Sequence, residues 1–257
     1  MWGYLDLSDV SISHETVTCT KDRAYDVLPE MSLKAGFEPH EYGLVLVKPN
    51  VCGMYHPSLQ LLESTLKFLE PLAQRIVVGE TDSTIHSPER EFARQGILEL
   101  LKGYGGKVEA RNLMNDEILR LSVPSPHAVT PLPIPKTVDG CDLLVNLPKI
   151  GTHSNTRLTC CLKNLFGLLA EKRKYLVYHP RGVDNVIADL AKIIRCDLNI
   201  VDAGDEVIVG VDPLSVDIHS CKYVNLDPLR VKHLRLVAED RGSRLEEEIA
   251  RLRVKKV

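Results

Sequence analysis

The residues from Cys141 to Leu169 read CDLLVNLPKIGTHSNTRLTCCLKNLFGLL, and the rest of the chain can be interpreted outward from them. The apolar run from Asp142 to Leu147 is typical of a buried strand. Pro148 should end that strand, because proline cannot donate a hydrogen bond to a sheet ladder. A polar turn follows, and from Thr156 to Leu169 the leucines recur with helical spacing. We therefore predict a strand, a turn and a helix.

The turn and the predicted helix start are rich in cationic and polar side chains. Ser154 or Asn155 can serve as the N-cap by accepting the first free N–H groups of the helix. Ligands of α/β proteins gather at strand ends, and a helix N-terminus attracts anions. The candidate binding and catalytic side chains of this unit are Lys149, Thr152, His153, Thr156, Arg157, Lys163 and Asn164. Alternatively, Arg157 and Lys163 are solvated charges on a helix surface.

Outside this unit the chain alternates apolar strands with amphipathic helices. The predicted strands cover residues 15–20, 44–47, 75–80, 107–113, 198–204 and 207–210. The predicted helices cover residues 21–35, 57–72, 87–104, 182–195, 213–222 and 228–238, with a helical tail at 243–256. Such alternation implies parallel strands joined by right-handed crossovers. We predict an α/β fold, a mostly parallel sheet with helices on both faces, as one domain over residues 1–257 or as two lobes around a cleft.

The segment 121–136 breaks this alternation, because five prolines fall between Pro124 and Pro135. Such a segment cannot form a helix or a central strand. We predict a linker or an extended edge segment there, and a boundary between two lobes would fall within it.

Three motifs occur in order along the chain. The first is Val45-Leu46-Val47-Lys48-Pro49-Asn50. The second is Lys149-x-x-x-His153, followed by Leu158-x-x-x-Leu162-Lys163-Asn164-x-x-Gly167. The third is Gly210-Val211-Asp212-Pro213-Leu214-Ser215-Val216-Asp217, ahead of a helix through His233-Leu234. Together they resemble the domain-of-unknown-function 362 family over about residues 40 to 245.

The resemblance implies an uncharacterised activity, because this family has no established general function. Some members are fused to iron–sulfur ferredoxin modules, but this sequence has no closely spaced cysteine quartet and hence no iron–sulfur motif. The loop at 51–56 is shorter than the corresponding loop of the family. The Lys149-x-x-x-His153 turn is also faintly similar to the cofactor lobe of nickel-pincer lactate racemases, from which we carry over no residues.

Composition and charge argue against several classes of protein. A net charge of −3 gives no overall attraction to nucleic acid or to anionic membranes, and no apolar run is long enough for a membrane span. Met1 to Asp6 lacks the basic start and apolar core of a signal peptide. The seven scattered cysteines favour reduced thiols in a cytoplasmic protein. We expect a small-molecule anion as the partner and leave a homo-oligomer open.

The carboxyl ends of parallel strands lie at one edge of a sheet, so the polar residues that follow four predicted strands should meet. These residues are Lys48, Asn50, Glu80, Asp82, Lys149, His153 and Asp202. We predict an anion-binding cleft there. His153, with an ordinary pKa of about 6.5, would be a general acid or base; its alternative role is to cap or pack a helix start. Lys163 would act as a base or Schiff-base nucleophile if nearby cations lower its pKa, and Lys149 is a further catalytic candidate.

A divalent metal is the cofactor class that the sequence leaves open. The candidate oxygen ligands are Glu80, Asp82, Asp202 and Asp217. Taken singly, each of these carboxylates is more often a turn or cap residue. Of the adjacent pair Cys160 and Cys161, one should pack in the core and the other should line the polar face. A zinc site would need further ligands at short spacing, and none is visible in the sequence.

Several common catalytic motifs are missing from the sequence. It has no Walker loop, no Gly-x-Gly-x-x-Gly after a strand and no Gly-x-Ser-x-Gly elbow, which argues against a standard nucleotide hydrolase, dinucleotide dehydrogenase or serine esterase. Two functions stay open: an enzyme acting on a small anionic metabolite, and a non-catalytic protein that binds a metal or cofactor or docks to a redox partner. We favour the enzyme, because proton transfer needs acid and base groups at one site.

Overall fold

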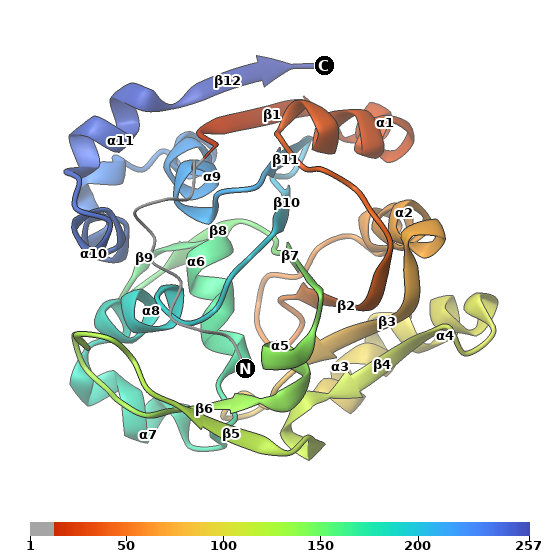
Figure 1. Cartoon of the computed structure of the whole chain (residues 1–257), viewed down its shortest axis with the longest axis horizontal. Coiled ribbons are helices and arrows are strands. Elements are labelled where there is room, and N and C mark those ends of the chain that lie inside the picture. Colours follow the sequence, from red (N-terminus) through yellow and green to blue (C-terminus); the bar gives the residue numbers. More distant parts are fainter. Residues whose placement is uncertain (1–12) are drawn as a thin grey trace.

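The computed structural model describes residues 13–257 and contains an eight-stranded sheet (Figure 1). The strand order is β12-β1-β11-β10-β7-β2-β3-β4. These strands are β1 (Glu15–Thr20), β2 (Tyr42–Pro49), β3 (Ala73–Glu80), β4 (Val108–Asn112), β7 (Leu143–Leu147), β10 (Leu198–Asp202), β11 (Glu206–Gly210) and β12 (Arg253–Lys256). The neighbours from β10 to β4 are parallel, whereas β11 is antiparallel to β10 and β1. The predicted α/β fold with a mostly parallel sheet is confirmed.

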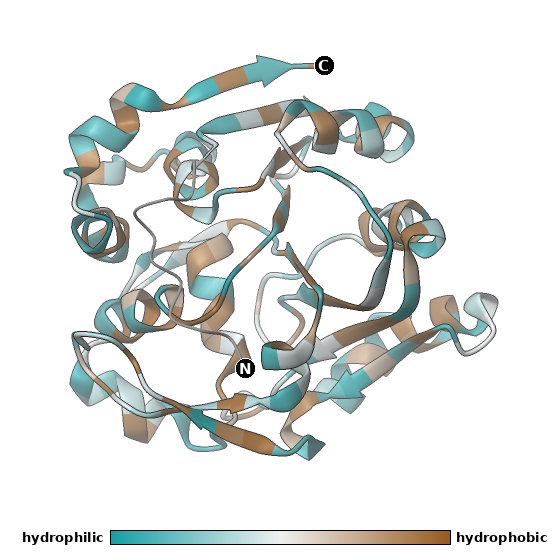
Figure 2. Ribbon diagram, in the orientation of Figure 1, coloured by the Kyte–Doolittle hydropathy of each residue, from teal (hydrophilic) through white to brown (hydrophobic). Residues whose placement is uncertain are grey.

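Helices cover both faces of the sheet (Figure 1). One face packs against α1 (Lys21–Lys34), α2 (Leu59–Leu69), α3 (Pro88–Arg94) and α4 (Ile97–Leu101). The other packs against α6 (Cys161–Asn164), α8 (Val183–Ala191), α9 (Pro213–Ser220), α10 (Lys232–Asp240) and α11 (Leu245–Arg251). In β2, Val45 and Val47 belong to the first core and Leu46 to the second. The middle of a central parallel strand is therefore apolar on both faces, as the hydrophobic colour of the middle of β3 also shows (Figure 2).

Two small antiparallel pairs stand apart from the main sheet. One joins β5 (Ile118–Leu121) to β6 (Leu132–Pro135), and the other joins β8 (Gly151–His153) to β9 (Arg157–Thr159). In the proline-rich segment, residues 122–131 form an irregular loop, and only the end of the segment is extended, as β6, before α5 (Lys136–Gly140) begins. The lobe boundary at 121–136 stays a prediction; β7, after this segment, pairs with β2, before it.

The helix predicted from Thr156 to Leu169 is wrong in its first half. Residues 151–159 form the β8–β9 hairpin, α6 begins at Cys161, and a short 3-10 helix follows at Leu165–Leu168. Arg157 has a left-handed φ of 64° and pairs with His153, so it does not lie in a first helical turn. The leucine spacing is real, but the hairpin buries Leu158 without a helix.

The predicted N-cap of this helix is also wrong. Neither Ser154 nor Asn155 lies at the start of α6. The N–H groups of Cys161 and Leu162 donate instead to the two carboxylate oxygens of Asp217, at 2.7 and 3.0 Å. Because Asp217 comes from α9, far along the chain, local sequence could not reveal this cap.

Most other predicted elements exist with shifted ends. The helix expected over 87–104 is interrupted at Gly96, whose φ of 76° suits glycine. The tail at 243–256 is helical only in α11 and ends as β12, which pairs with β1. Within residues 13–257, none of the helices combines the length and the hydrophobicity that crossing a membrane requires. Met1 to Asp6, on which the signal-peptide prediction rests, lie outside the described residues.

Candidate functional site at the carboxyl edge of the sheet

The ends of β2, β3, β7 and β10 meet at one edge of the sheet, as the sequence predicts. Lys48 of β2 lies in register with Asn146 of β7. Lys149, just after β7, forms a bridge with Asp202 at the end of β10, and Glu80 ends β3 beside β2. The edge therefore gathers lysines and carboxylates from segments that are distant in sequence.

An ion pair that is buried from solvent joins β2 to β3 at this edge. The amine of Lys48 donates to Glu80 Oε2 at 2.8 Å, to Asn164 Oδ1 at 2.9 Å and to the Pro49 carbonyl at 2.9 Å. Lys48 is 0% exposed and Glu80 3%. Burying two charges is costly unless hydrogen bonds satisfy them, and here three acceptors surround the amine. Lys48 and Asn164, which we predicted to bind a substrate anion, thus bind protein groups.

The backbone at Gly167 lies close against this ion pair, and only a residue without a side chain leaves room for it. A Cβ atom at residue 167 would lie 2.6 Å from Glu80 Oε1 and 2.7 Å from Lys48 Nζ. We expect Gly167→Ala to lower the free energy of unfolding by about 1–3 kcal/mol, as overpacking does, when measured by urea unfolding. Gly140→Ala is the control, since nothing lies within 4 Å of its Cβ position. Equal, small effects of the two substitutions would contradict the close approach.

Asn146 and Asn199 extend the buried polar network across the sheet. Asn164 Nδ2 donates to Asn146 Oδ1 at 2.7 Å, and Asn146 Nδ2 donates to Asn199 Oδ1 at 2.9 Å. Asn199 Nδ2 in turn donates to the Gly210 carbonyl in β11 at 3.2 Å. Sequence reasoning missed both asparagines, although a polar residue inside each apolar strand was the available signal. The network fixes α6 against the sheet.

Lys149 belongs to a second ion pair. Its amine donates to Asp202 Oδ1 at 2.6 Å, and Lys21 donates to Asp202 Oδ2 at 2.7 Å. The Ser58 N–H also donates to this carboxylate, which is 1% exposed. Burial alone would raise the pKa of Asp202, but these hydrogen bonds lower it. Lys149, which we predicted as a catalytic candidate, therefore holds a carboxylate of the protein itself.

The other predicted anion-binding side chains play local roles or face solvent. Asn50 Oδ1 accepts from the N–H of Lys149 at 2.8 Å, and Asn50 Nδ2 donates to the Lys149 carbonyl at 3.2 Å. Asn50 thus joins the ends of β2 and β7. The buried hydroxyl of Thr156 donates to the Leu158 carbonyl at 3.2 Å within the hairpin. Two residues of the hairpin, Thr152 and Arg157, are exposed.

Lys163 on α6 is different, because within residues 13–257 no hydrogen bond or ion pair reaches its amine. Its side chain is half-buried. Burial and the positive charge of Lys48 lower the pKa of Lys163 to about 8. Lys163 also lies close enough to His153 and His179 to lower the pKa of both. We call Lys163, His153 and His179 the basic cluster.

His153 uses one ring nitrogen to hold the hairpin turn. Nδ1 accepts from the N–H groups of Asn155 at 3.2 Å and Thr156 at 3.4 Å, which places the ring proton on Nε2. Burial and then the charge of Lys163 lower the pKa of His153 to about 4. The ring is therefore neutral at physiological pH. This geometry favours a hydrogen-bond donor over the general base suggested by the sequence.

Lys174 is a functional candidate that sequence reasoning missed. The basic run at 171–174 is typical of a solvated surface, yet Lys174 is only 6% exposed and donates to the Thr81 hydroxyl. Burial lowers its pKa to about 8, while the negative charge of Glu80 acts in the opposite direction. Nothing in the run itself distinguishes Lys174, because its burial depends on the loop after β3.

The four carboxylates predicted as metal ligands are not brought together. Glu80 pairs with Lys48, and Asp82 accepts from Asn112 at 3.0 Å. Asp202 binds two lysines, and Asp217 caps α6. Each carboxylate therefore has its own protein partner at a different place.

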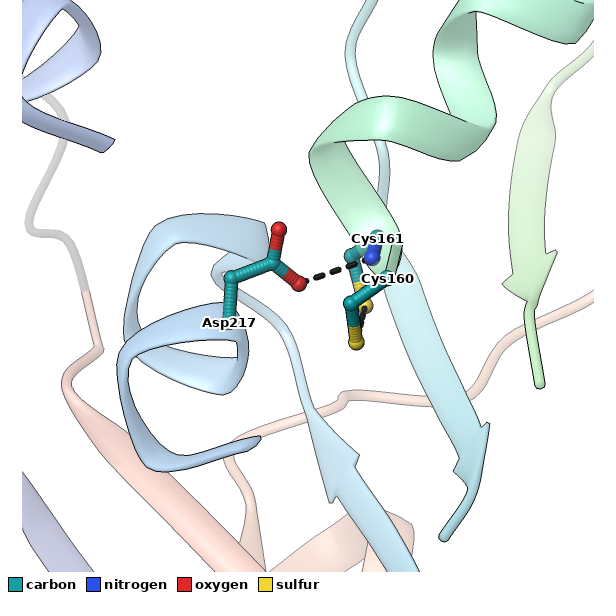
Figure 3. Close-up of side chains that lie close together, drawn as sticks. All are labelled: Cys160, Cys161 and Asp217. Carbon is teal, nitrogen blue, oxygen red and sulfur yellow. Dashed lines mark hydrogen bonds between the residues drawn. The ribbon is translucent and has the colours of Figure 1, made fainter. Parts of the chain in front are cut away.

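A different group of possible metal ligands occurs next to α6. Within residues 13–257, Cys160, Cys161 and Asp217 are the only group of three or more His, Cys, Asp or Glu residues whose candidate ligand atoms all lie within 4.8 Å of one another. Figure 3 shows the two thiols side by side, with 3.9 Å between their sulfur atoms, and Asp217 facing the N–H of Cys161. All three side chains are buried. Burial raises the pKa of both thiols, so both are protonated unless a metal displaces the protons.

Comparison with a family model identifies the relationships of this chain. The model described as "Domain of unknown function (DUF362)" matches residues 45–213. The chain belongs to the DUF362 family. This confirms the family that the sequence motifs suggested, although the match is shorter than the predicted range 40–245 and ends within the third motif. The match includes Lys48, Glu80, Lys149, His153 and Lys163.

Individual relatives of this DUF362 protein are distant. A thylakoid-associated protein of Synechocystis sp. is 29% identical over 116 residues, covering 39% of this chain and 36% of the relative. The lactate racemase apoprotein of Thermoanaerobacterium thermosaccharolyticum shares the fold with a TM-score of 0.51 at 14% identity, covering 81% of this chain and 56% of that one. A crystal structure of a Thermotoga maritima protein has a TM-score of 0.46 at 12% identity, covering 80% and 59%. The chain thus spans about a third of the curated relative and just over half of each solved structure.

Proposed function

We propose that this DUF362 protein is an enzyme that transfers a proton to or from a small anionic metabolite. The observation that carries the proposal is the state of Lys163. This lysine is half-buried, has no ion-pair partner within residues 13–257, and has a pKa lowered to about 8. Such an amine can attract an anion and can also release its proton near neutral pH.

His153 would complete the site as a neutral hydrogen-bond donor. With Nδ1 occupied by the hairpin turn, its Nε2–H is free to donate to a substrate oxygen that gains negative charge as a proton leaves. His179 shares the positive surroundings of Lys163, and its Nδ1 lies 3.2 Å from Asn155 Nδ2. The basic cluster therefore combines a titrating amine with fixed donors, the combination that a proton-transfer site needs.

Binding of anions should depend on the charge of Lys163. We expect that a carboxylate or phosphate metabolite found by thermal-shift screening loses about tenfold in affinity in a Lys163→Met variant, because a charge-assisted hydrogen bond is removed. In the unmodified protein the affinity should also fall as the pH rises through about 8. Calorimetric titration at pH 7 and pH 9 measures both effects. Lys172→Met, at an exposed lysine outside the basic cluster, is the matched control.

Catalysis is tested separately from binding. Each metabolite that binds is incubated with the protein in D2O, and deuterium incorporation is followed by mass spectrometry. We expect incorporation that depends on Lys163 and is slowed by about 100-fold or more in Lys163→Met, the typical contribution of a positioned acid or base. Binding without exchange would leave a binding protein, and unchanged affinity in Lys163→Met would exclude the basic cluster as the site.

A non-catalytic metal-binding protein is the second candidate, favoured by the group Cys160, Cys161 and Asp217. Thiolate ligands select soft or borderline ions such as Cu⁺ and Zn²⁺. Elemental analysis combined with native mass spectrometry of protein purified without a chelator or histidine tag tests this function. A stoichiometric metal that is lost in Cys160→Ser would support it, and a bare polypeptide mass would remove it.

A further inference from the structure

A pocket of about 350 Å³ lies between the β5–β6 pair and helix α7 (Lys174–Tyr178). These elements are close together at the bottom of Figure 1. The apolar part of the wall includes Ile118, Val129, Pro131, Pro133 and Val177. The volume falls within the range of small-molecule sites, about 300–1,000 Å³. Nothing in the proposed function uses this pocket.

The walls of the pocket are held in place by buried contacts. The carboxylate of Asp189, 0% exposed, accepts from the N–H groups of Ala128 and Val129, both at 2.9 Å. Elsewhere in the wall the N–H of Ala170 donates to the Pro133 carbonyl at 2.9 Å. The ring of Tyr178 packs edge-on against Phe166, with 5.8 Å between centroids. The pocket is therefore formed by the fold itself.

The polar groups of the pocket are mostly donors. Arg120 of β5 and Arg181, just after α7, both line it with exposed side chains, and within residues 13–257 neither guanidinium has an ion pair or hydrogen bond. The Tyr178 ring also lines it, and burial raises the pKa of its hydroxyl to about 12, so the hydroxyl keeps its proton. Glu171 is the acidic residue of the lining. Two guanidinium groups against one carboxylate leave a net positive charge.

We propose that this pocket is a second ligand site, which binds a small molecule carrying a carboxylate or phosphate group on an apolar body. Two free arginines suit such an anion, because a guanidinium can bind two of its oxygens at once. The proline and valine wall suits the apolar body. The site goes beyond the proposed function, which rests on Lys163.

One segment of the chain touches both sites. Tyr178 and Arg181 line the pocket, whereas His179, between them, belongs to the basic cluster and contacts Asn155 of the hairpin. A ligand of the pocket would therefore hold the segment that carries His179. Binding at the pocket can nevertheless be measured independently, because Lys163 does not line it.

The test is calorimetric titration with phenyl phosphate, with 4-phenylbutyrate and with the neutral amide 4-phenylbutyramide. We expect both anions to bind and the amide to bind at least tenfold more weakly. Arg120→Gln and Arg181→Gln should each weaken anion binding by about tenfold, the effect of removing one charge-assisted hydrogen bond. Arg173→Gln, at an exposed arginine that does not line the pocket, should leave the affinity unchanged.

The result also separates this pocket from the basic cluster. Lys163→Met should leave probe binding unchanged. Loss of probe binding in Lys163→Met, together with full binding in both arginine variants, would overturn the pocket and support the proposed function. No binding of either anion with a dissociation constant below about 10 mM would also overturn the pocket, whatever the outcome of the Lys163 experiments. Equal binding of acid and amide would exclude the arginines as the recognition groups.

Discussion

Replacing Glu80 with glutamine is expected to lower the free energy of unfolding by about 3–5 kcal/mol, because it leaves the amine of Lys48 buried without its counter-charge. The two groups are 2.8 Å apart and almost completely buried. Glutamine keeps the shape of the side chain, so the loss reports charge and not packing. Urea unfolding monitored by circular dichroism measures it.

The control for this prediction is an ion pair on the surface of the protein, where water surrounds both side chains. Glu99 and Lys102 also form an ion pair, but their side chains are 77% and 71% exposed. Glu99→Gln should therefore change stability by less than about 1 kcal/mol. In the double variant Lys48→Met/Glu80→Leu, much of the stability lost in Glu80→Gln should return, because an apolar pair needs no counter-charge. If Glu80→Gln lowered the free energy of unfolding as little as Glu99→Gln does, the Lys48–Glu80 pair would not be buried from solvent.

The Lys163→Met substitution is expected to raise the free energy of unfolding at pH 7 by about 1–3 kcal/mol, an effect opposite in sign to that of Glu80→Gln. The pKa of Lys163 falls from 10.5 to about 8 on folding. The unfolded chain therefore binds this proton more tightly, and below pH 8 the folded state carries an unfavourable, half-buried positive charge on Lys163. A residue that destabilises the fold in this way is typical of a functional site.

The pH dependence checks the sign of this effect. Between about pH 8 and 10.5 the unmodified protein should gain stability from the deprotonation of Lys163, so the advantage of Lys163→Met should shrink over that range. Denaturant unfolding at pH 7, 8 and 9.5 measures the difference. Lys172→Met, at an exposed lysine, should show no such trend. A destabilised Lys163→Met protein at pH 7 would mean that the amine has a binding partner in the folded state.

The apolar runs of the sequence determined the strands of the parallel sheet. Val45, Leu46 and Val47 predict a buried strand because a central parallel strand is apolar on both faces. Leu198 to Asp202 does so for the same reason. Strand–helix alternation then predicts that the strand ends share one edge, and Lys48, Glu80, Lys149 and Asp202 do meet there.

Long-range contacts decided what the polar residues at that edge do. Spacing suggested a helix from Thr156, but a cap from Asp217 starts α6 at Cys161, and Lys163 on that helix takes part in neither ion pair of the sheet edge. Lys149 has a carboxylate partner, whereas Lys163 has none among the described residues 13–257. The sequence could not show this difference, because ion pairing depends on which segments the sheet brings together.

By itself, then, the sequence determined the fold class, the family and the edge of the sheet where charged residues collect, since these depend on hydrophobic pattern and local motifs. Only the tertiary structure decided which of those charges are neutralised. Judged from the sequence alone, Lys48 and Lys149 are equally good anion-binding candidates, yet both form ion pairs within the protein. Lys163, by contrast, has no ion-pair partner within residues 13–257, because burial and pairing depend on contacts between distant segments.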